Sequence, residues 1–159
     1  MLFSIFNSER NLFRLIGSKT PMAIAYVKGG ENYEKIKGSV KFYSIPEGTV
    51  VVSEIFNLPE TETNFFAQHI HENGTCEGDF SSAGEHYNPA GVEHPCHAGD
   101  LPPLLSNQGY AWMALLDNRF KLNDIIGKSY IIHDCPDDFH TQPSGNSGTR
   151  IACGVIQRP

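Results

Sequence analysis

The sequence IKGSVKFYSIPEGTVVVSEIF, residues 36–56, decides the fold class. Val, Ile and aromatic residues, which favour strands, fill both halves of this stretch, and Pro46-Glu47-Gly48 separates the halves as a turn. After Gly38, apolar and polar residues partly alternate, as is typical of a half-buried strand. The stretch therefore predicts two consecutive strands, at 36–44 and 48–56.

Short segments of the same kind recur along the rest of the chain. They predict six further strands, at 22–28, 64–71, 110–116, 119–125, 129–133 and 150–157. Eight short strands favour an all-β fold, an antiparallel sandwich or barrel. Two long segments, 72–108 and 134–149, lack strand character. Loops longer than about 12–15 residues are usually functional or disordered, and the Cys and His residues in these two favour function.

The composition is that of an ordinary globular domain. The 159 residues include 40% hydrophobic and 19% charged side chains, which excludes a disordered chain. The net charge of −6 argues against general nucleic-acid binding, because phosphate binding requires clustered Lys and Arg. A small anionic substrate is still compatible with this charge, because a local positive field can steer an anion into a negative protein.

The sequence predicts no transmembrane segment, since it has no run of about 18 or more apolar residues. Its N-terminus differs from a secretory signal, because it lacks a basic start and because Asn7, Glu9 and Arg10 interrupt any apolar core. We therefore expect a cytoplasmic protein. An extracellular or periplasmic location is the alternative if a leader was removed.

An amphipathic helix is predicted over residues 2–16. Its apolar residues recur at helix-like spacing: Leu2, Ile5, Phe6, Leu12, Phe13 and Ile16. Such a helix could pack on its own domain, act as a dimer arm or lie on a membrane surface. We divide the chain into a helical extension, 1–21, and a β domain, 22–159.

Six of the seven histidines and one aspartate occur at spacings suited to metal ligands. His69 and His71 end a predicted strand, where residues i and i+2 project from one face. Imidazoles favour copper and zinc, although such a pair also occurs on surfaces without a metal. His133 ends another predicted strand, and His140 is left over. Three further imidazoles and a carboxylate could supply a tetrahedral zinc site: His86, His94, His97 and Asp100.

Four motifs resemble the signatures of the copper/zinc superoxide dismutases. They are His69-Ile70-His71-Glu72, Ala83-Gly84-Glu85-His86-Tyr87-Asn88-Pro89, Gly99-Asp100-Leu101-Pro102 and Gly148-Thr149-Arg150-Ile151-Ala152-Cys153-Gly154-Val155-Ile156. They occur in the family's order, and the resemblance covers roughly residues 22–157. It implies an eight-stranded antiparallel Greek-key sandwich or barrel.

The resemblance also implies the metal ligands. Copper would bind His69, His71, His86 and His133, and zinc would bind His86, His94, His97 and Asp100. His86 would then bridge the two metals. Arg150 matches the family's substrate-docking arginine, and Asp137 matches a carboxylate that hydrogen-bonds ligands of both metals. From the residues alone, Arg150 also fits a plain surface arginine and Asp137 a loop cap.

The family pattern implies a disulfide between Cys76 and Cys153, which would tie the first long loop to the last strand. Two reduced, buried thiols are the alternative. Cys96 and Cys135 have no counterpart in the family. Because they lie two residues from His94 and Asp137, which the family pattern places in contact, we predict a second disulfide between them. Free thiols or an adventitious copper ligand are the other readings.

The activity implied by the resemblance is dismutation of superoxide to dioxygen and hydrogen peroxide. Copper would carry the redox chemistry, because zinc has no accessible second oxidation state, and His86 would carry a proton. A copper-binding or copper-delivery relative with little turnover is the alternative. The interval from His94 to His97 is shorter than in the family, so the zinc half departs most from the pattern. Superoxide is the expected substrate, and we consider a homodimer as the assembly.

Overall fold

The computed structural model describes residues 16–159, which form an eight-stranded antiparallel sheet. The strand order is β5–β4–β7–β8–β1–β2–β3–β6. The strands are β1 (Ala23–Gly29), β2 (Lys37–Ile45), β3 (Gly48–Phe56), β4 (Phe65–His71), β5 (Asp100–Leu105), β6 (Ala111–Asp117), β7 (Ser129–His133) and β8 (Arg150–Gln157). Short helices between them are η1 (Glu31–Tyr33), η2 (Ser81–Ala83) and α2 (Leu122–Ile125). The all-β prediction is confirmed.

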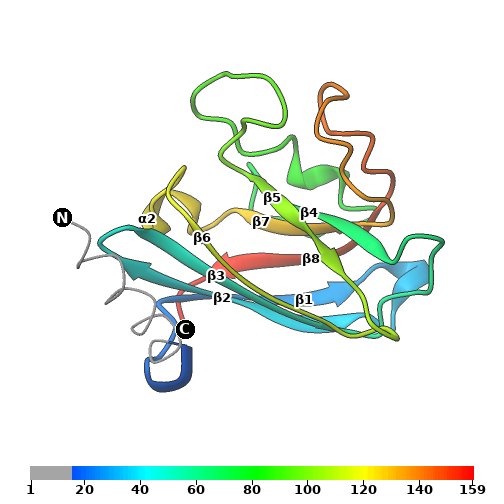
Figure 1. Cartoon of the computed structure of the whole chain (residues 1–159), viewed down its shortest axis with the longest axis horizontal. Coiled ribbons are helices and arrows are strands. Elements are labelled where there is room, and N and C mark those ends of the chain that lie inside the picture. Colours follow the sequence, from blue (N-terminus) through cyan, green and yellow to red (C-terminus); the bar gives the residue numbers. More distant parts are fainter. Residues whose placement is uncertain (1–15) are drawn as a thin grey trace, which may run out of the picture.

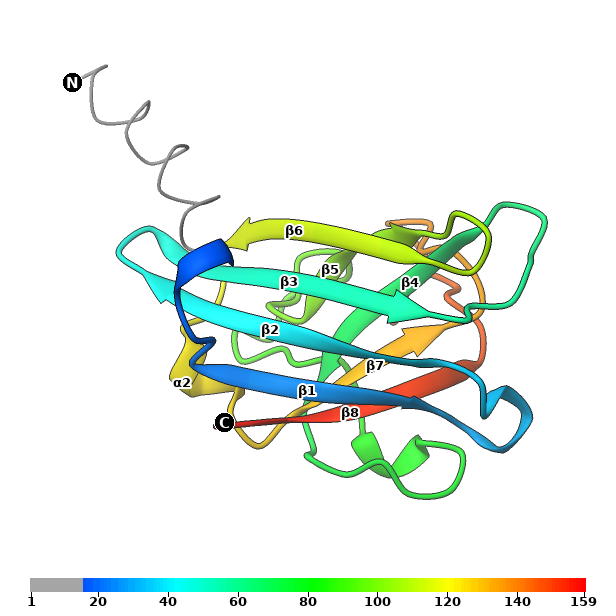
Figure 2. The same cartoon turned by 90° about the horizontal axis from the view of Figure 1, so that it is seen from below.

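The sheet curls into a nearly closed barrel (Figures 1 and 2). Its edge strands β5 and β6 follow each other in the chain, and Asn107 and Tyr110 exchange backbone hydrogen bonds of 2.8 and 3.1 Å in the turn between them. β3 and β4 are consecutive in the chain but pair with different neighbours, and so do β6 and β7. These crossing connections make the arrangement a Greek key.

The stretch at 36–56 forms the β2–β3 hairpin that it predicts. The register runs from Lys37 opposite Phe56 to Ile45 opposite Gly48. Gly48 has a φ of +152°, and a Cβ added there would lie 2.5 Å from the carbonyl oxygen of Asp117. Only glycine therefore allows the hairpin to approach the end of β6 this closely.

The predicted strand at 119–125 is wrong, because this segment forms a turn and the helix α2. Leu122 and Ile125, three residues apart, are both buried, which is the spacing of one helical face rather than of a strand. The backbone N–H of Lys121 donates to Asp124 Oδ2 at 3.0 Å and so closes the start of the helix.

The eighth strand lies instead inside the predicted loop 72–108, as β5. Pro102 and Pro103 argue against a strand in the sequence, because proline has no backbone donor. β5 stands at the end of the strand order and pairs only with β4, so one side of its backbone needs no ladder donors. The first long loop is therefore shorter than predicted, at 72–99.

A hydrophobic core fills the barrel. Seven strands, β1 to β5, β7 and β8, contribute fully buried side chains to it: Ala25, Val40, Phe42, Ile55, Phe66, Ile70, Leu104, Ile132 and Ile156. Burial of each larger side chain stabilises the fold by about 1.5–3 kcal/mol. The core holds β4 and β7 in place, and these strands carry three of the candidate ligands.

The two long loops, 72–99 and 134–149, rise on the same side of the barrel (Figure 1). The expected disulfide is present and joins Cys76 of the first loop to Cys153 of β8. Within residues 16–159, no helix is both long and apolar enough to cross a membrane. The helix predicted at 2–16 lies, apart from Ile16, outside the described residues and stays a prediction.

Candidate metal centre

Four histidines from separate parts of the chain converge beside the barrel. His69 and His71 lie at the end of β4, His133 ends β7, and His86 lies in the loop 72–99. One nitrogen from each ring lies within 4.8 Å of those of the other three, and the residues are at most 5% exposed. A β-bridge between His71 and His86 holds the loop histidine against β4.

One ring nitrogen of each of these histidines is buried without a hydrogen-bond partner. These atoms are Nδ1 of His69 and Nε2 of His71, His86 and His133. A buried polar atom without a partner costs free energy, so each such atom requires an explanation. Four neighbouring imidazole nitrogens are donors that suit copper, so these residues fit a copper ion.

The opposite ring nitrogens are held by the protein. His69 Nε2 donates to Asp137 Oδ2 at 2.8 Å, and His71 Nδ1 donates to the Gly84 carbonyl oxygen at 2.9 Å. Nδ1 of His133 lies 3.3 Å from the Ser147 hydroxyl oxygen. Contacts of this kind fix the tautomer and the orientation of a ligand ring, so that the unpaired nitrogen faces the metal position.

A second group shares His86 with the first and adds His94, His97 and Asp100. His86 presents Nδ1 to Asp100 Oδ1 at 2.7 Å, while its Nε2 faces the first group. Nδ1 of His94 and Nδ1 of His97 lie 3.0 and 3.2 Å from Asp100 Oδ2, yet neither makes a hydrogen bond. Three imidazoles and one carboxylate fit a tetrahedral zinc ion.

Burial keeps the imidazoles in the form that binds metals. It lowers the pKa of His69 to about 4 and the pKa of His71 to about 2, and it also lowers the pKa of His133. These rings are therefore neutral near pH 7, with a lone pair available to a metal. Burial alone would raise the pKa of Asp100, but the hydrogen bond and charge of His86 hold that pKa below its usual value.

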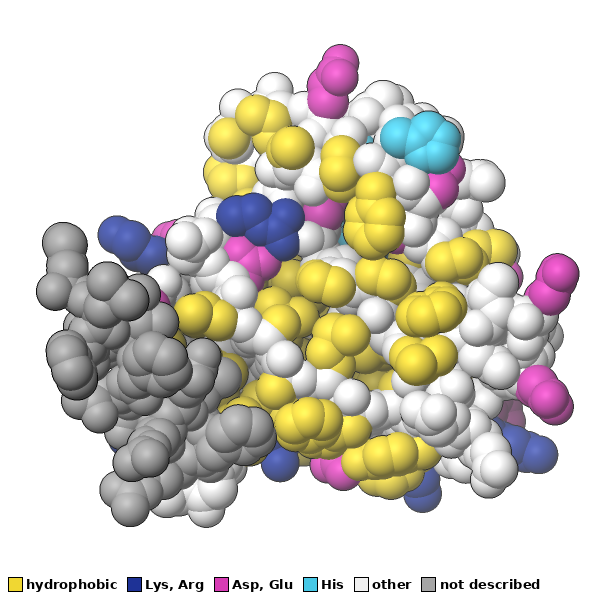
Figure 3. All heavy atoms as spheres, in the orientation of Figure 1, with side chains coloured by type: hydrophobic (Ala, Val, Ile, Leu, Met, Phe, Trp, Pro, Cys, Tyr) yellow, Lys and Arg dark blue, Asp and Glu magenta, His cyan; other side chains and the backbone are white. Residues whose placement is uncertain are grey.

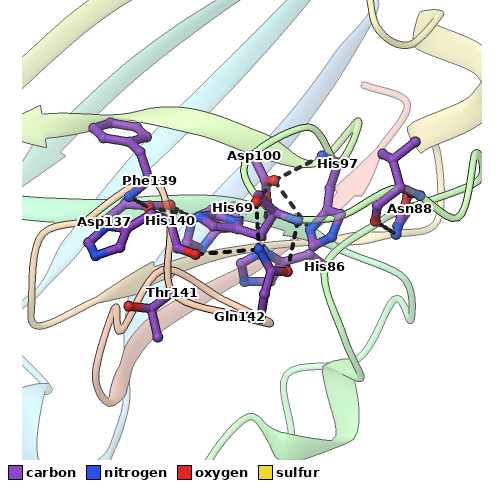
Figure 4. Close-up of polar contacts among 12 residues, drawn as sticks. His69, His86, Asn88, His97, Asp100, Asp137, Phe139, His140, Thr141 and Gln142 are labelled. Atoms are coloured by element: carbon purple, nitrogen blue, oxygen red, sulfur yellow. Dashed lines mark hydrogen bonds and ion pairs between the residues drawn. The ribbon is translucent and has the colours of Figure 1, made fainter.

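Asp137 joins the two groups from the loop 134–149. Its Oδ2 accepts from His69 and its Oδ1 accepts from His94 Nε2 at 2.9 Å, as the family resemblance implied. The loop passes so close that a Cβ on Gly145 would lie 2.1 Å from Asp137 Oδ1 and 2.7 Å from His94 Nε2. Figure 4 places Asp137 beside His69, on the far side from His97 and Asp100.

Arg150 lies at the start of β8 and is partly exposed. Its Nη1 donates to the carbonyl oxygen of Phe80 at 2.6 Å, and its Nη2 donates to that of Gly84 at 2.7 Å. The Gly84 carbonyl also accepts from His71. A single backbone oxygen thus links the guanidinium to the first histidine group.

The family assignment follows from comparison with known proteins. A family model described as copper/zinc superoxide dismutase matches residues 36–156. Superoxide dismutase (Cu-Zn) 1 of Aquifex aeolicus is 35% identical over 155 residues, which cover 87% of this chain and 88% of that protein. The chain belongs to the copper/zinc superoxide dismutase family.

Other similar proteins support the same family assignment. A solved SOD-like protein from Bacillus subtilis superposes with a TM-score of 0.71 at 32% identity, covering 82% of this chain and 95% of that one. The copper chaperone for superoxide dismutase of Rattus norvegicus is 29% identical, and the match spans 53% of its length. With both donor groups present, this superoxide dismutase has copper and zinc as its cofactors.

Gln142, which sequence reasoning missed, shapes the zinc half of this superoxide dismutase. The side-chain amide of Gln142 pairs with the backbone of His94: its Oε1 accepts from His94 N at 3.0 Å, and its Nε2 donates to His94 O at 2.7 Å (Figure 4). The sequence gives no sign of this pairing, because Gln142 lies 48 positions from His94 and belongs to no motif. It clamps the loop 72–99 to the loop 134–149.

The second disulfide predicted between Cys96 and Cys135 is not formed, and both are free, exposed thiols. Although His94 and Asp137 are in contact, the two cysteines turn to different surroundings. Sγ of Cys135 packs beside Gly148, whereas Cys96 lies in a turn of the other loop in which its backbone N–H donates to the Glu93 carbonyl oxygen at 2.9 Å. The Gln142 amide makes the clamp that the disulfide was expected to make.

Proposed function

We propose that this superoxide dismutase holds copper at His69, His71, His86 and His133, and zinc at His86, His94, His97 and Asp100. The observation that carries the proposal is the division of the buried ring nitrogens into two groups that share His86. When bound, copper supplies one-electron redox chemistry and zinc supplies a fixed positive charge. Residues of the chain carry out substrate docking and proton transfer.

We assign Arg150 to docking of the superoxide anion. Its guanidinium has five N–H donors, of which the carbonyl oxygens of Phe80 and Gly84 take two. The remaining donors can make charge-assisted hydrogen bonds to a small anion. Anchoring by two backbone oxygens limits the motion of the side chain, so the anion is held close to the first histidine group.

We assign proton transfer to Nε2 of His86. The reaction converts two superoxide anions and two protons into dioxygen and hydrogen peroxide. His86 Nε2 lies with the first group, and histidine is a common general acid and base in enzymes. On this proposal Nε2 would take up a proton from solvent when it is not bound to copper and give that proton to the forming peroxide, and water would give the second.

For the metal-loaded protein we expect equal amounts of copper and zinc, and removal of superoxide that cyanide inhibits.

Replacing Arg150 by alanine should lower kcat/KM by roughly 10- to 100-fold, because a local positive charge steers the anion. Arg150→Lys should retain more activity, since lysine keeps the charge but not the fork. Stopped-flow decay of superoxide measures this.

Arg158→Ala is the matched control, because it removes the same charge from a side chain that pairs with Asn123. It should leave kcat/KM within about 2-fold, as for a surface substitution. Stoichiometric metal without turnover would instead support the copper-binding alternative, and an equal loss in both variants would contradict docking at Arg150.

We propose that two copies of this chain assemble through the outer side of β6 and its neighbours. Exposed apolar side chains gather there over β3, β4, β5 and β6 (Figure 3): Phe56, Phe65, Leu105, Tyr110, Trp112 and Leu116. Contiguous apolar patches of this kind mark interaction surfaces. Sedimentation should give a dimer that Trp112→Glu dissociates, and a monomeric wild type would contradict it.

We also propose a cytoplasmic location and a division into the extension 1–21 and the domain 22–159. A cytoplasmic disulfide must be shielded from reductants, and the 2% exposure of Cys153 supports that shielding. Cell fractionation distinguishes this location from an extracellular or periplasmic one.

A further inference from the structure

The turn from His97 to Asp100 carries two of the four proposed zinc ligands, one at each end. Asp100 N donates to His97 O at 3.2 Å and closes the turn, and His97 N donates to Asp100 Oδ2 at 2.9 Å. The inner side of the turn rests on β4, because Ile70 N donates to Gly99 O at 2.9 Å. A Cβ on Gly99 would lie 2.2 Å from Ile70 O, so glycine permits this contact.

The outer side of the same turn is held by Arg119, from the segment between β6 and α2. Its Nη1 donates to His97 O at 3.1 Å, and its Nη2 donates to Asp100 O. The two accepting carbonyls belong to the two ligand residues themselves. The planar fork of an arginine can span both ends of a turn in this way, whereas the ammonium of a lysine cannot.

Asp117 orients the guanidinium. Nε of Arg119 lies 3.1 Å from each Asp117 carboxylate oxygen, and the Arg119 backbone N–H donates to Oδ1 at 2.8 Å. Asp117 is 6% exposed, so its charge requires this partner. A guanidinium is charged at any working pH, so Arg119 balances the buried Asp117 carboxylate.

We propose that Arg119 is a positioning residue for the zinc half of the site, which fixes the carbonyls of His97 and Asp100 so that their side chains meet at one zinc ion. The inference rests on the zinc ligands proposed above. The interval between His94 and His97 leaves two residues to shape the loop. Arg119 supplies from outside the loop the constraint that so short a segment cannot supply itself.

The test measures zinc affinity by chelator competition and the d–d spectrum of the cobalt(II)-substituted protein, on the full chain. Arg119→Ala should weaken zinc binding by about 10- to 100-fold, the range for residues that orient metal ligands, and leave copper affinity within about 3-fold. Arg119→Lys should lie between Arg119→Ala and wild type. Arg158→Ala, with the same change in charge, should bind zinc as wild type does.

Two outcomes would overturn the role of Arg119. The first is a zinc affinity of Arg119→Ala within about 3-fold of the wild-type value, because the loss would then be smaller than that caused by removing residues that orient metal ligands. The other is an equal loss of copper and zinc affinity, which indicates general destabilisation. If Arg119→Ala does not fold, Arg119→Lys decides by the same criteria. His97→Ala serves as the reference: unchanged zinc affinity there would contradict the zinc assignment itself rather than Arg119.

Discussion

Replacing His133 by alanine is expected to lower superoxide turnover by roughly 10³-fold or more, about 4 kcal/mol of transition-state stabilisation. His133 ends β7, is 3% exposed, and buries an Nε2 atom that has no hydrogen-bond partner. Its loss leaves three imidazoles in the proposed copper site, with a gap on the β7 side. Pulse radiolysis gives the turnover, and elemental analysis gives the copper content.

His140→Ala is the matched control for His133→Ala. His140 is the one histidine outside both groups, its side chain is 79% exposed, and the contacts of its ring are to Asp138. We expect this variant to keep its copper and its turnover. Full copper content and turnover in His133→Ala would contradict the copper assignment, because a buried ligand cannot be removed without effect.

Cys76→Ser is expected to lower the free energy of unfolding by roughly 4 kcal/mol, since the disulfide closes a segment of 77 residues in the unfolded chain. For a domain of this size that corresponds to a fall in Tm of roughly 8–16 °C. Calorimetry of the protein without added reductant measures it. Activity should fall as well, because the bridge packs beside Phe80, whose carbonyl anchors Arg150.

The double variant Cys96→Ser and Cys135→Ser is the control for the disulfide. Both thiols are free and exposed, so we expect Tm to change by no more than about 1 °C, as for surface substitutions. A Tm of Cys76→Ser equal to wild type would contradict the stabilising role of the bridge. A large fall in the double variant would show that its thiols do more than the structure indicates.

Seven of the eight strands could be predicted because each carries its own local pattern. The β2–β3 hairpin needs only β-favouring residues around Pro46-Glu47-Gly48. β5 could not be predicted, because Pro102 and Pro103 are acceptable only at a sheet edge, and the edge is a property of the whole barrel. The prediction of a strand at 119–125 was wrong because the apolar residues there fit the spacing of a strand as well as that of a helix. Packing against the barrel selects the helix α2.

The candidate ligands could be recognised in the sequence, since residue type and spacing are local and four motifs resembled one family. Tertiary structure decided which ring nitrogen of each histidine points inward and which is held by Asp137 or Gly84. It also decided that Gln142 and Arg119 hold the zinc loop, while Cys96 and Cys135 stay apart. These contacts join residues far apart in the chain, and their side chains meet because the barrel fixes the directions of both loops.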